Sequence, residues 1–230
     1  MHGGWASWNN GDAGINTTCT KETTSYCYLS CGRLNKCGRC NAFTCYDDVF
    51  FVRQLLNELN SKYCVDTKQV SASGDSAGGM FTYYLSHQAA DVIQNFGIIA
   101  GHPLVGRIGV DQENIQGAYV MAMNGRKDGT LPPAGGIDRT GEWIYESVKD
   151  TFEVFGLSQG CKLNSWTHVA TPWDNFVPAS GIQGKNLHCM EYTSGCSGRV
   201  MQCMHDGNHN TVPEYMADLT WWFWNSRNQQ

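Results

Sequence analysis

The sequence predicts an α/β fold with a doubly wound, mostly parallel sheet. Strand-like and helix-like segments alternate from residue 46 to the C-terminus, which is the order that such a sheet requires. One strand-like segment also leads through residues 74–78, Gly-Asp-Ser-Ala-Gly, into a helix-like segment without proline. Two glycines around a serine at such a junction predict a sharp strand-to-helix turn that presents the Ser76 hydroxyl.

Periodicity predicts the individual elements in order. Residues 46–62 form an amphipathic helix, and one face of it carries Val49, Val52, Leu55, Leu56 and Leu59. Strands are predicted at residues 68–73, 96–100, 118–123, roughly 166–170 and 199–204. Further helices are predicted at residues 77–90, near 139–156 and at the C-terminal end.

The last helix has a sequence signature of its own start. Thr211 is its predicted N-cap, Pro213 lies in the first turn, and Glu214 stands three residues after the cap, which is a capping box. The helix is predicted to pack with Met216, Leu219 and Phe223.

Ser76 is the candidate nucleophile. A serine hydroxyl attacks an ester only if it projects from a sharp turn toward a base. At such a turn the backbone and the following helix lie so close that we expect Gly74 and Gly78 to tolerate no side chain. The alternative is an ordinary glycine turn, but the strand before it and the helix after it favour the nucleophile.

Asp128 is the candidate acid. A serine nucleophile needs a base, and the base needs an orienting carboxylate, which for this turn follow in the order Ser, Asp, His. The apolar run 118–123 ends just before a glycine, and Asp128 follows in a loop closed by two prolines. A carboxylate beyond the C-terminal end of a strand points toward the crevice where open α/β sheets bind ligands. The alternative is a solvated turn aspartate, since Lys-Asp-Gly is ordinary turn chemistry.

Two histidines near the C-terminus could serve as the base. The strand predicted at residues 199–204 is followed by His205 and, beyond a glycine, by His209. His205 adjoins the strand and could be a packed histidine or a turn partner of Asp206, whereas His209 lies in the strand-to-helix loop. We therefore favour His209 as the base.

Four stretches of the chain resemble the secreted polyhydroxybutyrate depolymerase and feruloyl esterase family of α/β-hydrolases. They are residues 47–52 (Asp-Asp-Val-Phe-Phe-Val) with 63–66 (Tyr-Cys-Val-Asp), residues 73–80 (Ser-Gly-Asp-Ser-Ala-Gly-Gly-Met), residues 124–133 (Asn-Gly-Arg-Lys-Asp-Gly-Thr-Leu-Pro-Pro) with Gly135-Gly136, and residues 207–209 (Gly-Asn-His). The resemblance implies an α/β-hydrolase fold in which Ser76, Asp128 and His209 match the nucleophile, the acid and the base.

The chain also departs from that family. The family usually has His where Asn124 stands, and an aromatic residue followed by Pro soon after the base, where this chain reads Asn210-Thr211-Val212-Pro213. These departures bear on substrate preference more than on the chemistry.

The residues and the resemblance together predict a secreted serine esterase without cofactor or metal. The backbone N–H of Ala77 is expected to stabilise the oxyanion. Asp75, beside the serine, and Trp166 and Trp173, between acid and base, are expected to bind substrate. The resemblance implies feruloyl or acetyl esters of plant cell-wall polysaccharide, or short polyesters such as hydroxybutyrate oligomers, as substrates. The alternatives are an inactive, disulfide-rich binding module on the same fold and a serine peptidase.

Composition limits the partners. The chain has 230 residues and a formal net charge of -5, and it contains no basic cluster, so neither nucleic acid nor an anionic membrane surface is an expected partner. No apolar run approaches the roughly 20 residues that span a bilayer. An N-glycosylation sequon at Asn16 agrees weakly with export.

Eleven cysteines favour an oxidising compartment. Those at positions 19–45 crowd into a polar stretch with almost no apolar periodicity, so residues 1–45 are predicted to be a disulfide-stapled segment before a catalytic domain of residues 46–230. A structural zinc site at Cys37 and Cys40 is the alternative. Cys64, Cys161, Cys189, Cys196 and Cys203 are predicted to tie the main domain, with one thiol left over because the total is odd.

The N-terminus has two interpretations. Residues 2–5, His-Gly-Gly-Trp, could be the oxyanion loop of lipases. Residues 5–11 instead resemble the family's Ser-Trp-Asn-x-Gly stretch, which follows that loop and a further strand. We favour the second interpretation, and we expect a secretory signal, the preceding strands and one oxyanion donor to lie outside this chain.

Overall fold

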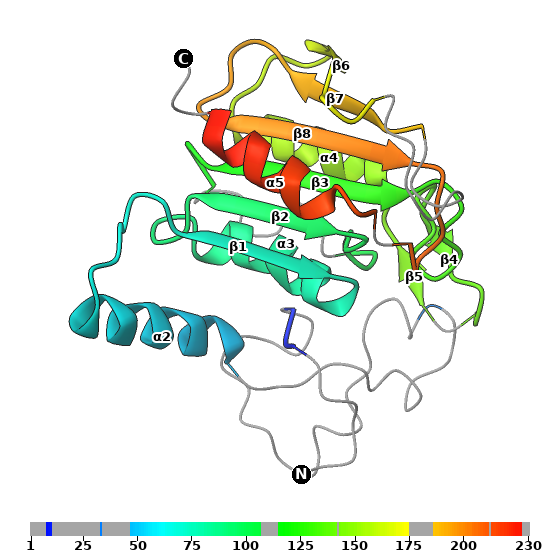
Figure 1. The fold of residues 1–230 in the computed structure, drawn as a ribbon. Helices are drawn as coiled ribbons and strands as arrows, with labels where there is room; N and C mark the ends of the chain where they lie inside the picture. The colour runs from blue at the N-terminus through cyan, green and yellow to red at the C-terminus, as the bar shows by residue number, and fades with distance from the viewer. Residues whose placement is uncertain are drawn as a thin grey trace, which may run out of the picture.

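The structure is a computed structural model of the chain and describes residues 8–10, 33, 47–106, 115–141, 143–174, 186–211 and 213–226 (Figure 1). The cysteines at positions 19–45, the sequon at Asn16 and residues 2–5 lie outside the described residues. The stapled N-terminal segment, the zinc alternative and the interpretations of the N-terminus therefore stay predictions.

Six strands form one sheet in the order β1-β2-β3-β8-β7-β6 (Figure 1). Their bounds are β1 Ser71–Asp75, β2 Asn95–Ile99, β3 Tyr119–Gly125, β6 Trp166–Val169, β7 His188–Tyr192 and β8 Arg199–His205. The pairs β1·β2, β2·β3 and β3·β8 are parallel, whereas β7 pairs antiparallel with β8 and β6 antiparallel with β7. The prediction of an α/β fold with a mostly parallel sheet is confirmed.

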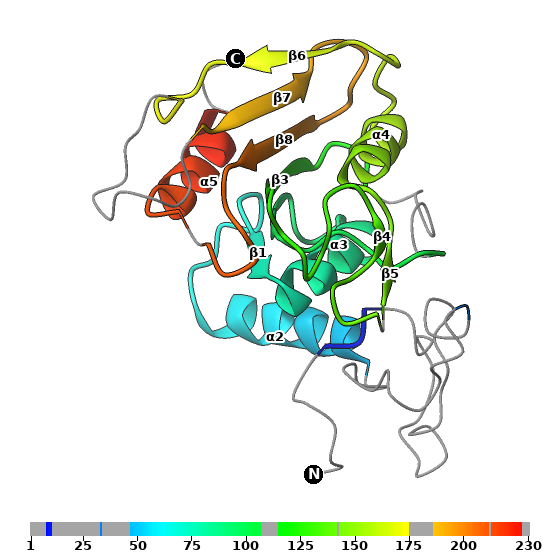
Figure 2. The ribbon, with the colours of Figure 1, turned by 90° about the vertical axis from the view of Figure 1, so that its right-hand side faces the viewer.

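Helices cover both faces of this sheet. Figure 2 shows α5 (Met216–Asn225) on one face, with α3 (Ala77–Gln88) and α4 (Val148–Ser158) on the other. The helix α2 (Asp48–Lys62) lies beyond the β1 edge of the sheet (Figure 1). A small hairpin of β4 (Gly136–Ile137) and β5 (Ile144–Tyr145) lies near the ends toward which β1, β2, β3 and β8 point.

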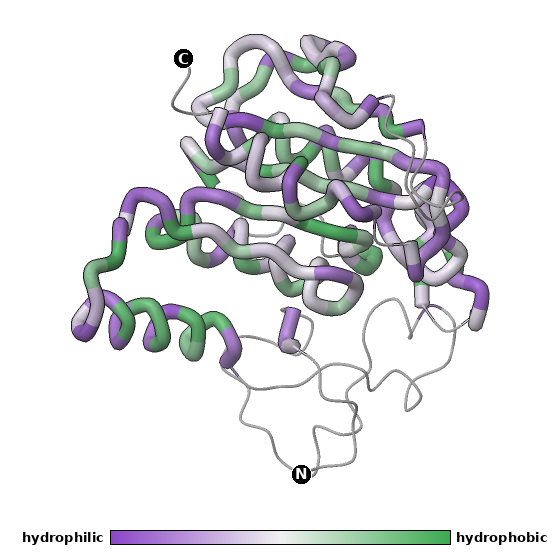
Figure 3. Tube along the Cα trace, in the orientation of Figure 1, coloured by the Kyte–Doolittle hydropathy of each residue, from purple (hydrophilic) through white to green (hydrophobic). Residues whose placement is uncertain are grey.

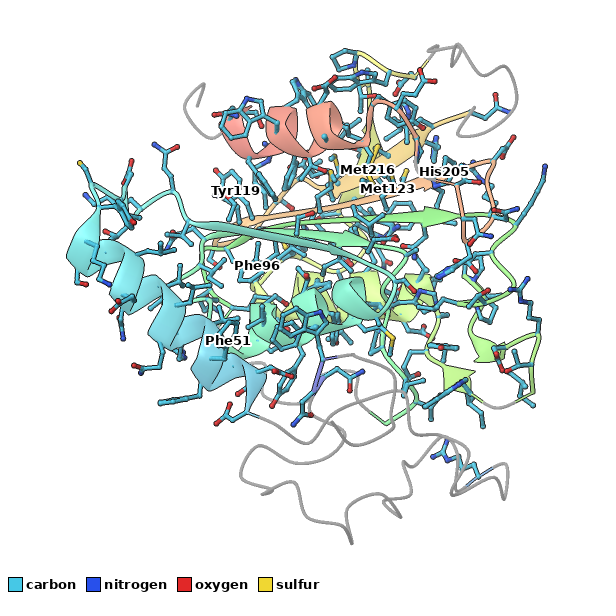
Figure 4. The ribbon with its side chains drawn as sticks, turned by 60° about the horizontal axis from the view of Figure 1, so that its bottom comes forward. Phe51, Phe96, Tyr119, Met123, His205 and Met216 are labelled. Carbon is cyan, nitrogen blue, oxygen red and sulfur yellow. A yellow bond between two sulfur atoms is a disulfide. The ribbon has the colours of Figure 1, made fainter. Side chains whose placement is uncertain are left out.

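The core has two layers because the central strands are covered on both faces. β2 is buried at every residue and β3 at every residue after its first, which is the pattern of a parallel strand between helices. These strands are largely apolar in Figure 3. Phe96 belongs to the cluster that α3 and α4 cover, and Met123 to the cluster that α5 covers (Figure 4).

The predicted apolar face of α2 is only partly buried. Val49, Val52 and Leu56 pack on the core, but Leu55 and Leu59 are 44% and 36% exposed. Residues 49, 52 and 56 lie at spacings of three and four, so they form one stripe of the helix. Leu55 and Leu59 lie at the other edge of the same apolar face, where the described residues leave them exposed.

The predicted capping box of the last helix is also wrong. α5 begins at Met216, after Tyr215, and no side chain caps it. The Thr211 hydroxyl instead accepts a hydrogen bond from the Asn208 N–H at 3.0 Å, within the turn before the helix. Thr211 therefore shapes the loop of His209.

Other boundaries shift or appear only in the structure. α4 begins at Val148, where Ser147 caps it, and the residues before it form β5 rather than helix. The strand β7 was not predicted. It is a short antiparallel strand between two others, and the expected alternation of helices and strands has no place for it.

Two disulfides tie the main domain. Cys161 is bonded to Cys196, and Cys189 is bonded to Cys203. The second bond joins paired positions of β7 and β8. The prediction for these four cysteines is confirmed, whereas Cys64 is an exposed free thiol. No helix in the described ranges is long and apolar enough to span a membrane.

Candidate active site

Ser76 lies in a strained turn between β1 and α3. Its φ of 53° and ψ of -120° lie in a backbone region that residues other than glycine rarely adopt. Such strain costs on the order of 1–3 kcal/mol. The turn is fixed by a hydrogen bond from the Ser76 N–H to the Ile99 carbonyl at 2.9 Å. The sequence therefore located the sharp turn correctly.

Close packing at the turn falls on Gly74 and Gly79. A Cβ on Gly74 would lie 2.3 Å from the Gly78 carbonyl oxygen, and one on Gly79 would lie 2.4 Å from the Ile99 carbonyl oxygen. A Cβ on Gly78 would meet no atom within 4 Å. The expectation for Gly74 is confirmed. That for Gly78 is wrong, because Gly79 and not Gly78 is the residue of α3 that faces β2.

Asp128 lies in the loop that follows β3. Its Oδ1 accepts hydrogen bonds from the N–H groups of Thr130 and Leu131, both at 2.8 Å, so the backbone fixes the carboxylate. Burial raises the pKa of Asp128, but hydrogen bonds from His209 and from these two N–H groups outweigh burial and hold that pKa below its ordinary value. The carboxylate is therefore charged, and its Oδ2 remains available to a second partner.

His209 lies in a short turn after β8. The Asn210 N–H donates to the Asn208 side chain, and the Thr211 N–H to the Asn208 carbonyl, so both bonds close the turn that carries His209. This loop lies directly against the loop of Asp128. The N–H groups of Arg126 and Lys127 donate to the carbonyls of His205 and Gly207, both at 2.8 Å.

The structure brings Ser76, His209 and Asp128 into one hydrogen-bonded row. Ser76 Oγ lies 2.8 Å from His209 Nε2, and His209 Nδ1 lies 2.7 Å from Asp128 Oδ2. The Asp128 side chain is 1% exposed and that of His209 is 16% exposed. A charged carboxylate that accepts from Nδ1–H leaves Nε2 as an acceptor, so the imidazole can take a proton from the serine hydroxyl.

The other site residues predicted from sequence lie at different distances from this row. Ala77 is the first residue of α3, and the N–H groups of a first helical turn have no acceptor within the helix. Asp75 ends β1 directly before the serine. Burial raises the pKa of Asp75, although the nearby His209 acts against that increase. Both residues adjoin Ser76.

The two tryptophans lie toward opposite ends of β6, Trp166 at its first residue and Trp173 four residues after its last. Trp166 is the first residue of the edge strand β6 and pairs with Tyr192. Because β6 runs in the same direction as β8, Trp166 lies at the end of the sheet where β8 begins. That end of the sheet is opposite the one that carries the serine. Trp173 packs with Tyr215 and Trp222 on the α5 face.

The alternative base, His205, is packed at the end of β8. It is 3% exposed, and burial, together with the positive charge of Arg126, lowers its pKa to about 4. Its Nδ1 has no hydrogen-bond partner within the described residues, and no contact joins it to Ser76. The interpretation of His205 as a packed histidine agrees with this position.

Sequence reasoning missed the buried histidine His102. It follows β2, and its Nε2 lies 3.1 Å from the Pro132 carbonyl oxygen and its Nδ1 3.2 Å from Asn124 Nδ2. Burial lowers the pKa of His102 to about 4, so it is neutral. The signal that could have found it is a polar residue, between Gly101 and Pro103, shortly after the apolar run 96–100.

Within the described ranges, no group of three or more His, Cys, Asp and Glu side chains is arranged to hold a metal ion.

No protein-family model matches the chain. Feruloyl esterase C of Emericella nidulans is 28% identical over 182 residues, which are 77% of this chain and 57% of that protein. Feruloyl esterase B of Piromyces equi is 49% identical over 47 residues, which are 20% of this chain and 9% of that protein. A solved structure, the acetyl xylan esterase from Aspergillus awamori, has a TM-score of 0.52 at 13% identity, over 76% of this chain and 66% of that one. The last match shows a shared fold.

We expect opposite effects from two alanine substitutions in the first turn of α3. Gly79→Ala should destabilise the protein by about 1–3 kcal/mol or more, because its Cβ meets backbone atoms that cannot move independently. Gly78→Ala should be neutral or stabilising by up to about 1 kcal/mol, because alanine favours helix and the position is open. Urea unfolding of both variants measures this difference, and equal stability would contradict the packing at the turn.

The free energy of unfolding should fall as the pH is lowered from about 6.5 toward 4. The unfolded chain protonates His102 near pH 6.5, whereas the folded protein does so only near pH 4, so acid favours the unfolded state by up to about 1.4 kcal/mol per pH unit for this residue. Asp128 does not interfere, because its lowered pKa acts only below about pH 4.

Urea unfolding at several pH values, on the wild type and His102→Gln, measures this dependence. The slope of the unfolding free energy against pH reports the number of protons taken up on unfolding, and in His102→Gln this number should be smaller by up to one. Identical slopes would show that His102 is not held neutral.

Proposed function

Because the chain is a distant homologue of the feruloyl esterases over most of its length, we propose that it is a serine esterase. The observation that carries the proposal is the row of hydrogen bonds from Ser76 Oγ to His209 Nε2 and from His209 Nδ1 to Asp128 Oδ2. The chain spans 57% of the length of the feruloyl esterases C that it matches, so the activity of the whole protein is part of the proposal.

The proposed mechanism uses each member of the row once in each half-reaction. His209 Nε2 accepts the proton of Ser76 as Oγ attacks the ester carbonyl, and it then gives that proton to the leaving alcohol. Asp128 keeps its negative charge, holds the Nδ1–H tautomer and stabilises the imidazolium that forms. Water then attacks the acyl-serine, and His209 again accepts and returns a proton.

The negative charge that develops on the carbonyl oxygen needs a donor at its final position. The N–H of Ala77 supports this role, because it directly follows the serine at the N-terminus of α3. Removal of one such donor costs about 10² to 10³ in rate in a serine hydrolase.

The substrates proposed are feruloyl or acetyl esters of plant cell-wall polysaccharide, with short hydroxybutyrate polyesters as a further class. The names of the relatives support the first class, because they are feruloyl esterases and a bifunctional acetylxylan esterase/xylanase from Neocallimastix patriciarum. The two disulfides support secretion. We also propose that residues 46–230 are the catalytic domain, because all three residues of the row lie within it.

A hydrolysis screen with a reactive probe tests the proposal. The substrates are methyl ferulate, p-nitrophenyl acetate, hydroxybutyrate oligomers and a peptide amide, and a fluorophosphonate labels an activated serine. We expect hydrolysis of at least one ester and labelling of Ser76. Labelling together with cleavage of the amide as well as of esters would indicate a peptidase, and neither labelling nor hydrolysis would indicate an inactive binding module.

Substitutions in the row should lower kcat in a fixed order. Ser76→Ala and His209→Ala should each cost about 10⁶, because either change removes the attack on the carbonyl, and Asp128→Asn should cost about 10⁴, because it favours the wrong tautomer. His205→Ala is the matched control and should change kcat by less than about tenfold, since its imidazole does not reach the serine. A severe loss in His205→Ala with a mild one in His209→Ala would contradict the proposed base.

A further inference from the structure

Gln202, Asn124 and His102 form a buried row of side-chain hydrogen bonds, and all three are less than 10% exposed. The Gln202 amide Nε2 donates to the Cys203 carbonyl at 2.9 Å and to Asn124 Oδ1 at 3.2 Å. A backbone carbonyl can only accept, so this contact identifies the nitrogen of Gln202. The Asn124 atom beside it must then be oxygen, which turns the Asn124 NH₂ group toward His102.

The direction of every bond in the row follows from its two ends. The Asn124 NH₂ group donates to His102 Nδ1, so Nδ1 carries no proton and Nε2 does. That Nε2–H faces the Pro132 carbonyl, which again can only accept. In a charged imidazole Nδ1 would also carry a proton, so two donors, Nδ1–H and the Asn124 NH₂ group, would face each other. Only the neutral histidine, in one tautomer, fits this row.

The Pro132 carbonyl belongs to the loop of Asp128. The N–H of Leu131, the preceding residue, donates to Asp128 Oδ1, and the Leu131 side chain is buried with Leu104 and Tyr145. The N–H of Gly135 also donates to Pro132, but that bond closes a turn within the loop. His102 therefore connects the second half of the loop to the end of β2.

The first half of the loop is held by a different element. Arg126 and Lys127 donate to backbone carbonyls just after β8. The carboxylate of Asp128 thus lies between one attachment to β8 and another, through His102, to β2.

Burial of a histidine at this position is unfavourable unless its ring nitrogens form hydrogen bonds. Burial of an unpaired polar group costs several kcal/mol, whereas an apolar ring would pack against Tyr145, whose ring centre lies 5.7 Å from that of His102, without desolvation. Both nitrogens of His102 are paired, and one pair crosses to the loop of Asp128.

We propose that His102 is a positioning residue: by holding the Pro132 carbonyl it fixes the loop that aims Asp128 Oδ2 at His209. Among the described residues no contact joins His102 to Ser76, so its proposed action runs through Asp128. The inference rests on the proposed esterase function, but its structural part, the geometry of the Asp128–His209 pair, can be measured without any substrate.

The test compares His102→Phe, His102→Leu and His102→Gln with the wild type. Phenylalanine keeps a ring and leucine keeps apolar volume, but neither can hold the loop, whereas glutamine offers one acceptor and one donor. The matched control is His87→Leu, because His87 is buried to the same degree in α3, where its Nδ1 lies 2.9 Å from the Tyr83 carbonyl oxygen.

The first readout is the far-downfield proton resonance of His209 Nδ1–H, which reports its hydrogen bond to Asp128. The resonance should be present in the wild type, in His102→Gln and in His87→Leu, and it should be lost or broadened in His102→Phe and His102→Leu. The second readout is kcat per titrated serine, which should fall by about 10²-fold in the two apolar variants, because a displacement of about 1 Å has that effect. KM should stay within about threefold.

The outcomes separate this inference from the proposed function. An unchanged resonance and an unchanged kcat per site in His102→Phe and His102→Leu would show that His102 only fills space and would overturn the inference. A wild type that shows the resonance but hydrolyses no ester would refute the esterase, while the resonance in the variants would still decide the positioning role. A wild type without the resonance would overturn the inference itself, because the Asp128–His209 pair would then be wrong.

Discussion

The parallel pairing of β1, β2, β3 and β8 is the constraint on which the site depends. The register places Asp75 beside Ile99, Ile99 beside Met123, and Met123 beside Cys203, so four strands end at one edge of the sheet. Ser76 and His209 are 133 residues apart in the chain, and Asp128 and His209 are 81 apart. Each of the three follows one of these strands by a few residues. A shift of register in one pair would separate the hydrogen-bonded row.

Close backbone contacts convert that common edge into a defined geometry. A Cβ on Gly125 would lie 2.5 Å from the Gly207 carbonyl oxygen, so the loops after β3 and β8 touch where each leaves its strand. On the other side, Gly79 lets α3 approach the end of β2, and this approach supports the strained backbone of Ser76. The strain persists because the surrounding strands fix both ends of the turn.

The electrostatics of the site follow from what each group can donate or accept. Two backbone N–H groups and an imidazole keep Asp128 charged although it is buried. Close by, Gln202 donates to Asn124, Asn124 donates to His102, and His102 donates to the Pro132 carbonyl. This row carries no charge, because it consists of two amides and a neutral imidazole. The row that contains the Asp128 carboxylate and the neutral row that ends at His102 thus meet at the loop of residues 128–132. The neutral row holds this loop without placing a second charge beside Asp128.

Residues whose signal is local could be predicted from the amino-acid sequence. Ser76 stands in a motif that needs only its own strand and helix, and Asp128 and His209 could be predicted because polar residues after apolar strands, in the order Ser, Asp, His, are local features of the chain. The sequence also favoured His209 over His205, but it could not measure the burial that leaves His205 without a contact to the serine.

Features that depend on neighbours far away in the chain could not be predicted and are seen only in the fold. Gly79 rather than Gly78 faces β2, Leu55 and Leu59 stay exposed although Leu56 is packed on the core, and the Thr211 hydroxyl accepts a hydrogen bond in the turn of His209 instead of capping α5. The position of His102 after an apolar run does not reveal its role, because its partners lie 22 and 30 residues away. Periodicity and propensity report what a segment prefers alone, whereas these choices are set by which surface or carbonyl the sheet brings against it.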